Sequence, residues 1–241
     1  MTAFLISVCP LAAKEQFIYT QISQHEGLTS TVNCIYKEKD GNVWLGTPNG
    51  LYSFNGNILH NHQDSTFAGK RVYQTNADRN GDLWILTNRG LVRKNGRHFE
   101  IIRSEGKGTD GKPFLCMCED EEGIWFGSNR EIYRYSFEDS SLSLFRDLVE
   151  KSSFLIRNIE IIDRHTLLCS SHNGLLFVDT ETGAIKETPF AIFNEVSATL
   201  VDSKGRIWVS FYNNGIVVFE KDGTILHRYT TSCSDLSNDV V

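Results

Sequence analysis

The sequence predicts an all-β fold, namely about five four-stranded blades of an incomplete β-propeller. The first observation is a repeat whose steps of 40, 41, 43 and 40 residues separate five aligned positions: Trp44, Trp84, Trp125, Leu168 and Trp208. A second marker keeps steps of 40, 41, 43 and 41 residues at Gly50, Gly90, Glu131, Gly174 and Gly215. A fixed period of roughly 20 to 50 residues is typical of repeat architectures. The second observation is that tight turns divide each copy into runs too short for helices.

The first copy shows the elements most clearly. Strand-type runs at residues 32–37, 43–47, 51–54 and 58–62 are separated by Asp40-Gly41 and Asn49-Gly50. These dipeptides favour hairpin turns, because glycine tolerates the positive φ that such turns need. Four short antiparallel strands in a period of about 40 residues are typical of a propeller blade.

The later copies repeat this pattern with losses. The runs at 83–87 and 124–128 follow Asn80-Gly81 and Glu122-Gly123, and the fifth copy has Lys204-Gly205 before Trp208. The fourth copy loses the first turn and the tryptophan, but keeps its second turn at residues 170–175. Helical repeats of similar length are excluded, because the turn dipeptides interrupt every run before a stable helix length is reached. We expect the repeated tryptophans to pack between blades rather than to form a sugar platform.

The repeat gives a domain organisation. Residues 1–16 are interpreted as a truncated secretion signal, since an apolar stretch at 4–13 precedes small residues without the usual positive charges. An ordinary first strand is the alternative. Residues 17–241 form the propeller fragment, with blades at about 28–65, 66–107, 108–150, 151–192 and 193–235. Residues 17–22 resemble the last strand of a preceding blade, and 236–241 resemble the start of a following one.

The composition excludes some classes of function. The net charge of −6 and the pI near 5.7 argue against nucleic-acid binding, which needs clustered Lys and Arg. No apolar run reaches the roughly 18 residues that a membrane-spanning helix requires, so we expect no membrane contact by this segment. The six cysteines lack metal-site spacing, and Cys116 and Cys118 are expected to be buried on one strand face.

The repeat resembles the two-component regulator propeller repeat of hybrid two-component systems (hybrid histidine kinases) of Bacteroidetes. The resemblance is carried by ISQHEGLTSTVN at 22–33 and DGNVWLGTPNGL at 40–51. Degenerate copies extend it to residue 241, with departures at Leu86, Glu131 and Leu168. It implies a seven-bladed propeller on the periplasmic side of an inner-membrane receptor, where fragments of a polysaccharide are recognised. The kinase and DNA-binding parts of such receptors are not encoded in these residues.

Four motifs were considered as functional sites and interpreted as structural. Residues 106–113 nearly match a phosphate-binding loop, but Pro113 stands where a hydroxyl is needed. Asp78, Asn80 and Asp82 alternate as in a calcium loop but align with the Asp40-Gly41 turn. His60 and His62 share a strand face without a third metal ligand, and are expected to be solvent-facing edge histidines. The acidic residues at 119–122 are expected to be a solvated charge run.

The functional prediction is therefore a ligand-sensing, extracytoplasmic propeller and not an enzyme. Catalytic, metal and cofactor sites are assigned to no residue, cofactors are expected to be none, and ligand-binding residues are left unassigned. The expected partners are an oligosaccharide, the rest of the sensor chain and a second receptor copy. A glycan lyase or hydrolase and a protein-interaction propeller remain alternatives, because propellers host all three functions.

Overall fold

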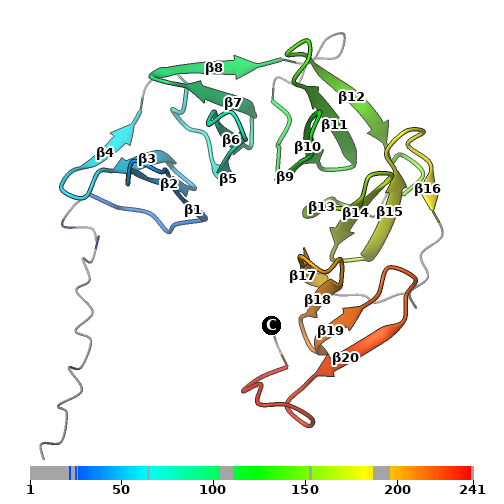
Figure 1. Ribbon diagram of the computed structural model, residues 1–241. Coiled ribbons are helices and arrows are strands. Elements are labelled where there is room, and N and C mark those ends of the chain that lie inside the picture. The colour runs from blue at the N-terminus through cyan, green and yellow to red at the C-terminus, as the bar shows by residue number, and fades with distance from the viewer. Residues whose placement is uncertain are drawn as a thin grey trace, which may run out of the picture.

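The computed structural model describes residues 22, 25, 27–63, 66–103, 111–151, 154–186 and 196–239. In this part of the chain, 20 strands form five separate four-stranded antiparallel sheets. The sheets are arranged around an open arc, with their first strands on the inner side and their fourth strands on the outer rim (Figure 1). The all-β, propeller-type prediction is confirmed.

The sheets are named blades I to V in chain order. Blade I contains β1 (Cys34–Lys37), β2 (Val43–Thr47), β3 (Gly50–Phe54) and β4 (Leu59–His62). Blade II contains β5 (Val72–Ala77), β6 (Leu83–Thr87), β7 (Gly90–Asn95) and β8 (His98–Ile102). Blade III contains β9 (Cys116–Glu119), β10 (Gly123–Ser128), β11 (Glu131–Ser136) and β12 (Leu142–Asp147). Blade IV contains β13 (Asn158–Asp163), β14 (Thr166–Ser171), β15 (Gly174–Asp179) and β16 (Ile185–Lys186). Blade V contains β17 (Val196–Val201), β18 (Ile207–Phe211), β19 (Gly215–Phe219) and β20 (Ile225–Tyr229).

The apolar core lies between blades. Four clusters of buried side chains join neighbouring blades, from I–II to IV–V. Trp44, Trp84 and Trp125 are buried in the first three of these interfaces, and Leu168 takes the same position in the fourth. Trp44, Trp84 and Trp125 therefore pack between blades as predicted. Trp208 in blade V is only half-buried and stacks on Tyr229, with ring centroids 6.0 Å apart.

The first hairpin loop of a blade usually contains a glycine whose backbone φ lies in the left-handed region. Gly41, Gly81 and Gly205 have φ of 94°, 86° and 76° in blades I, II and V. A three-residue hairpin loop places its last residue in this region, which a glycine adopts without steric cost. In blade III the loop is one residue shorter, and Gly123 is already the first residue of β10.

Blade IV corrects one expectation. The prediction that its first turn is lost was wrong, because Arg164 and His165 join β13 to β14 in a two-residue turn. The backbone N–H of His165 donates to Asp163 Oδ1 at 3.0 Å, which supports the turn without a glycine.

The blade boundaries stay a prediction, and several segments lie outside the described residues. These are the proposed signal at 1–16, residues 17–21 of the proposed preceding strand, residues 106–110 of the phosphate-loop motif, and residues 240–241 of the proposed following blade. Residue 22 is described but belongs to no strand. Within the described residues, no helix has the length and apolar character needed to cross a membrane.

Candidate functional site

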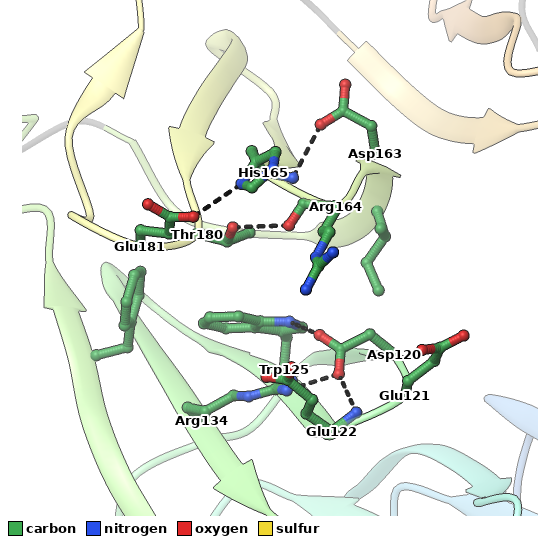
Figure 2. Close-up of a pocket in the computed structure, with 12 residues that line it drawn as sticks. Asp120, Glu121, Glu122, Trp125, Arg134, Asp163, Arg164, His165, Thr180 and Glu181 are labelled. Carbon is green, nitrogen blue, oxygen red and sulfur yellow. Dashed lines mark hydrogen bonds and ion pairs between the residues drawn. The ribbon is translucent and has the colours of Figure 1, made fainter.

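A cavity of about 700 Å³ lies between blades III and IV. Its blade III side is formed by the β9–β10 turn and by residues of β10, β11 and β12. Its blade IV side is formed by the end of β13, the Arg164–His165 turn and the residues that follow β15. Figure 2 shows the labelled side chains of both blades on opposite sides of the opening. The cavity volume is within the range of small-ligand sites, roughly 300 to 1,000 Å³.

On the blade III side, Asp120 holds both Trp125 and Arg134. The indole Nε1 of Trp125 donates to Asp120 Oδ2 at 2.7 Å, and Arg134 Nη2 donates to Asp120 Oδ1 at 2.6 Å (Figure 2). The backbone N–H of Glu122 also donates to Oδ1, at 2.9 Å. Burial opposes ionisation of Asp120, but these hydrogen bonds outweigh burial and lower its pKa. Asp120 is therefore a carboxylate at neutral pH and acts as an acceptor rather than as a general acid.

Aromatic rings add an apolar surface to this side. The Arg134 guanidinium carbon lies 4.3 Å from the centroid of the Trp125 ring, a cation–π contact. Phe145 packs edge-on against Trp125 with centroids 4.8 Å apart. The indole is thus fixed in orientation by an ion-paired arginine, a carboxylate and a second ring.

The blade IV side presents polar groups from two turns. His165 Nδ1 lies 3.0 Å from Glu181 Oε1, and the Thr180 hydroxyl donates to the carbonyl oxygen of Arg164 at 2.9 Å (Figure 2). The side chain of Arg164 extends toward the opening (Figure 2) and forms no ion pair with the described residues. It can therefore donate to a molecule in the cavity.

The lining is richer in carboxylates than in cations. Five carboxylates face two arginines and one histidine among the described lining residues. This combination of fixed acceptors, arginine donors and aromatic surface can hold a molecule rich in hydroxyl groups. A hydrolytic carboxylate pair needs one member that stays protonated, and the lowered pKa of Asp120 prevents it from serving as that acid.

The motifs that the sequence suggested lie elsewhere or take structural roles. Asp78 accepts from the backbone of Asn80 and Asp82 and from the Trp84 indole, as a turn residue does. Lys112, from the edge of the phosphate-loop motif, forms an ion pair with Glu131 at 2.6 Å. Glu119 pairs with Arg79 of blade II at 2.6 Å.

Two expectations need correction. The interpretation of residues 119–122 as a solvated charge run was wrong for Asp120, which is part of the cavity wall. His62 is not solvent-facing: its ring lies 5.1 Å from Trp44 and 5.6 Å from Phe99, and its Nε2 is 2.9 Å from Ser53 Oγ. His60 is exposed, as expected.

The cysteines of the III–IV interface are buried thiols. Cys116 is buried and Cys118 is partly buried, in agreement with the sequence for Cys116. Burial raises the pKa of both thiols and raises that of Cys169 to about 12. A thiol that stays protonated is a poor nucleophile, so these residues fill space.

Sequence reasoning missed the link between an aspartate and three of the four tryptophans. The indole Nε1 donates to the turn aspartate in blades II, III and V, through Trp84 to Asp78, Trp125 to Asp120 and Trp208 to Asp202. The signal was present as an aspartate five or six residues before each of these tryptophans. From the sequence, these aspartates were interpreted only as turn residues.

The fold and its repeats define a β-propeller module. Residues 26–49 match the family model of the two component regulator propeller, so the chain carries a repeat of that family, as the sequence resemblance indicated. No curated protein matches the sequence.

Solved structures share the fold at low identity. The extracellular domain of the hybrid two component system BT3049 from B. thetaiotaomicron has a TM-score of 0.69 and 18% identity, over 91% of this chain and 33% of that one. The corresponding domain of BT4673 from the same organism has a TM-score of 0.56 and 17% identity, over 89% and 36%. The chain thus spans about a third of the length of these two domains. Virginiamycin B lyase from Staphylococcus aureus gives 0.63 and 14%, over 84% and 71%.

Proposed function

We propose that this chain is a ligand-sensing propeller segment of a hybrid two-component receptor, located in the periplasm and responding to an oligosaccharide released from a polysaccharide. The observation that carries the proposal is the regulator propeller repeat at residues 26–49. The shared fold with extracellular domains of two hybrid systems supports it. In this proposal the chain itself catalyses no reaction, and the kinase belongs to other parts of the receptor.

The cavity between blades III and IV is compatible with a sensing role. It offers oriented donors, acceptors and an aromatic ring without an activated nucleophile among its described lining residues. Two blades contribute to it, so a bound molecule would bridge them. We further propose that the full-length receptor forms a homodimer.

The location is tested by protease accessibility in cells. An epitope-tagged copy of the natural protein is expressed from its own locus, and spheroplasts are treated with protease. We expect the propeller to be digested while a cytoplasmic control protein survives. Protection of the propeller until the cells are lysed would exclude the periplasmic location.

The signalling role is tested in membranes that contain the intact receptor. Phosphorylation from radiolabelled ATP is measured with and without oligosaccharides from partial digests of several neutral and acidic polysaccharides. We expect at least one digest to change the phosphorylation level. Absence of a response to every digest would reject the proposal.

A propeller enzyme is the second candidate, and the likeness to virginiamycin B lyase concerns the fold alone. Incubation of the intact receptor's propeller region with the same polysaccharides distinguishes the two functions. We expect no new reducing ends or unsaturated products. Product formation that scales with protein concentration would favour the enzyme.

A further inference from the structure

Charged residues are divided unequally between the two ends of the blades. The connections from first to second strand and from third to fourth strand lie at one end, which we call the acidic end. The connections from second to third strand and from blade to blade lie at the opposite, basic end. Among the described residues of these connections, Asp and Glu outnumber Lys and Arg by 13 to 7 at the acidic end, whereas Lys and Arg outnumber Asp and Glu by 8 to 3 at the basic end. The net charge of −6 is therefore not spread evenly over the molecule.

Most cations of the basic end have no opposite charge beside them. Five of them form no ion pair with the described residues: Arg71, Arg89, Arg130, Lys151 and Arg157. The last three lie on the β10–β11 turn and on the neighbouring β12–β13 loop, whose described residues are 148–151 and 154–157. A guanidinium without a partner in its own chain can pair with a carboxylate of another molecule.

The β12–β13 loop has a fixed arrangement. Leu148, Phe154 and Ile156 are buried in the core cluster between blades III and IV, so they anchor the loop. The backbone N–H of Leu148 donates to the carbonyl oxygen of Arg130 at 2.8 Å, and that of Ile156 donates to the carbonyl oxygen of Asn129 at 2.6 Å. Both limbs of the loop therefore lie against the β10–β11 turn, and Arg130 lies beside both.

The same loop exposes two aliphatic side chains. Val149 is 64% exposed and Leu155 is 44% exposed, although each is next to a residue that is hydrogen-bonded to the β10–β11 turn. The loop that precedes β5 shows that the fold does not require them, because it buries Phe67 and then exposes Ala68 and Gly69. Together with the three cations, the two aliphatic residues form one surface, which we call the III–IV patch: Arg130, Val149, Lys151, Leu155 and Arg157.

The composition of the III–IV patch distinguishes between classes of partner. Arginine binds carboxylates through two parallel hydrogen bonds. A nucleic acid or another polyanion would contact the cations but would leave Val149 and Leu155 in water. A protein segment with both carboxylates and apolar side chains can contact both kinds of residue, and apolar contacts surrounded by polar ones are typical of protein interfaces.

We propose that the III–IV patch is a docking surface for an acidic segment of a partner protein. Carboxylates of this segment pair with Arg130, Lys151 and Arg157, and an apolar side chain packs against Val149 and Leu155. The fixed loop lowers the entropy that is lost on binding. This inference adds a protein partner to the proposed receptor and does not depend on the ligand that the receptor senses.

The experiment measures the binding of designed peptides to the full-length protein by fluorescence anisotropy. The probe is a short peptide of alternating Glu and Leu with a neutral fluorophore. One reference peptide replaces every Glu by Gln, and the other replaces every Leu by Ser. Labelled polygalacturonate represents a polyanion without apolar side chains.

We expect the Glu–Leu peptide to bind about tenfold more tightly than either reference peptide, and to bind more weakly at high ionic strength. Arg157→Glu should weaken binding about fivefold, and Leu155→Ser about threefold. Arg97→Glu and Ile58→Ser are the matched controls, because both residues are exposed in turns at the acidic end. Each control should leave the affinity unchanged within about twofold. Lys151→Glu serves if Arg157→Glu does not fold, and should have a similar effect.

Four results would overturn the inference. Absence of peptide binding would show that the III–IV patch does not dock acidic segments. Equal binding of the Glu–Ser peptide would show that the apolar residues have no part in recognition. Tighter binding of polygalacturonate would assign the patch to a polyanion. Equal effects of the patch and control substitutions would place the peptide elsewhere. The phosphorylation assay tests the sensing function separately from all four.

Discussion

Glu160 is a half-buried carboxyl group at the III–IV interface, and its charge is unfavourable there. Burial raises its pKa, and the hydrogen bond from Asn158 Nδ2 at 3.2 Å offsets burial only in part. Because the folded-state pKa is raised, protonated Glu160 stabilises the fold at low pH, and this contribution is lost as pH rises through the folded pKa.

Glu160→Gln is therefore expected to increase the free energy of unfolding at pH 7. The increase should shrink as pH falls toward about 4, where the natural carboxyl group is protonated in both states. Urea denaturation of both proteins between pH 4 and 8 measures this difference. A gain independent of pH would contradict the electrostatic explanation.

The aspartates that accept from the indoles of Trp84, Trp125 and Trp208 give a second prediction at the residue scale. Asp78 and Trp84 are buried, whereas Trp208, the partner of Asp202, is half-buried. Asp78→Ala leaves the indole N–H and two backbone N–H groups without their acceptor, and should cost about 1 to 3 kcal/mol of stability. Asp202→Ala is the matched control and should cost less, because water can replace the lost acceptor. Equal losses in chemical denaturation would show that burial does not set the cost.

At the element scale, Gly127, two residues after Trp125, allows blades III and IV to approach closely. A Cβ added to Gly127 would lie 2.5 Å from Cys116 Sγ and 2.7 Å from Ile156 Cγ2. Gly127→Ala should therefore destabilise the III–IV interface by about 1 to 3 kcal/mol, as overpacking does. Ile156→Ala removes the Cγ2 that the new methyl group would meet, so in a double-mutant cycle the double variant should lose less stability than the sum of the two single losses. Additive losses would show that the contact with Ile156 is not the cause.

The strands could be predicted from sequence because each depends on a short local pattern. Residues 43–47 were expected as a strand and are β2, since a short apolar run between two turn dipeptides specifies this element without tertiary information. The turn of blade IV was missed because Asp163 supports it through a side chain and not through a glycine.

The cavity could not be predicted in the same way. Its lining comes from the β9–β10 turn and three strands of blade III and from β13 and two turns of blade IV, and these segments come together only in the folded chain. The sequence could identify Trp125 as an interblade residue, but not that the Arg164–His165 turn of the next blade lies across the opening from it.

At the scale of the whole molecule, stability comes from faces that blades share. Blades I to IV each bury their tryptophan position against the following blade. Trp208 lacks such a cover within the described residues, and its cross-strand neighbour Leu200 is 57% exposed. On blade I, at the other end of the arc, Ile35 is 67% exposed. The two end blades do not meet in Figure 1.

Such faces should make the isolated 241-residue chain associate with itself. Contiguous exposed apolar surface is uncommon on soluble monomers, and exposed strand edges provide further pairing sites. We expect sedimentation velocity to show species larger than a monomer that increase with protein concentration. Leu200→Lys places a charge beside Trp208 and should reduce this association, whereas Lys204→Ala, in the nearby β17–β18 turn, should not. The contrary result would be a monomer that melts cooperatively and keeps the same sedimentation coefficient at all concentrations. It would mean that the end faces are stable in water. A blade's tryptophan would then not need a neighbouring blade to shield it.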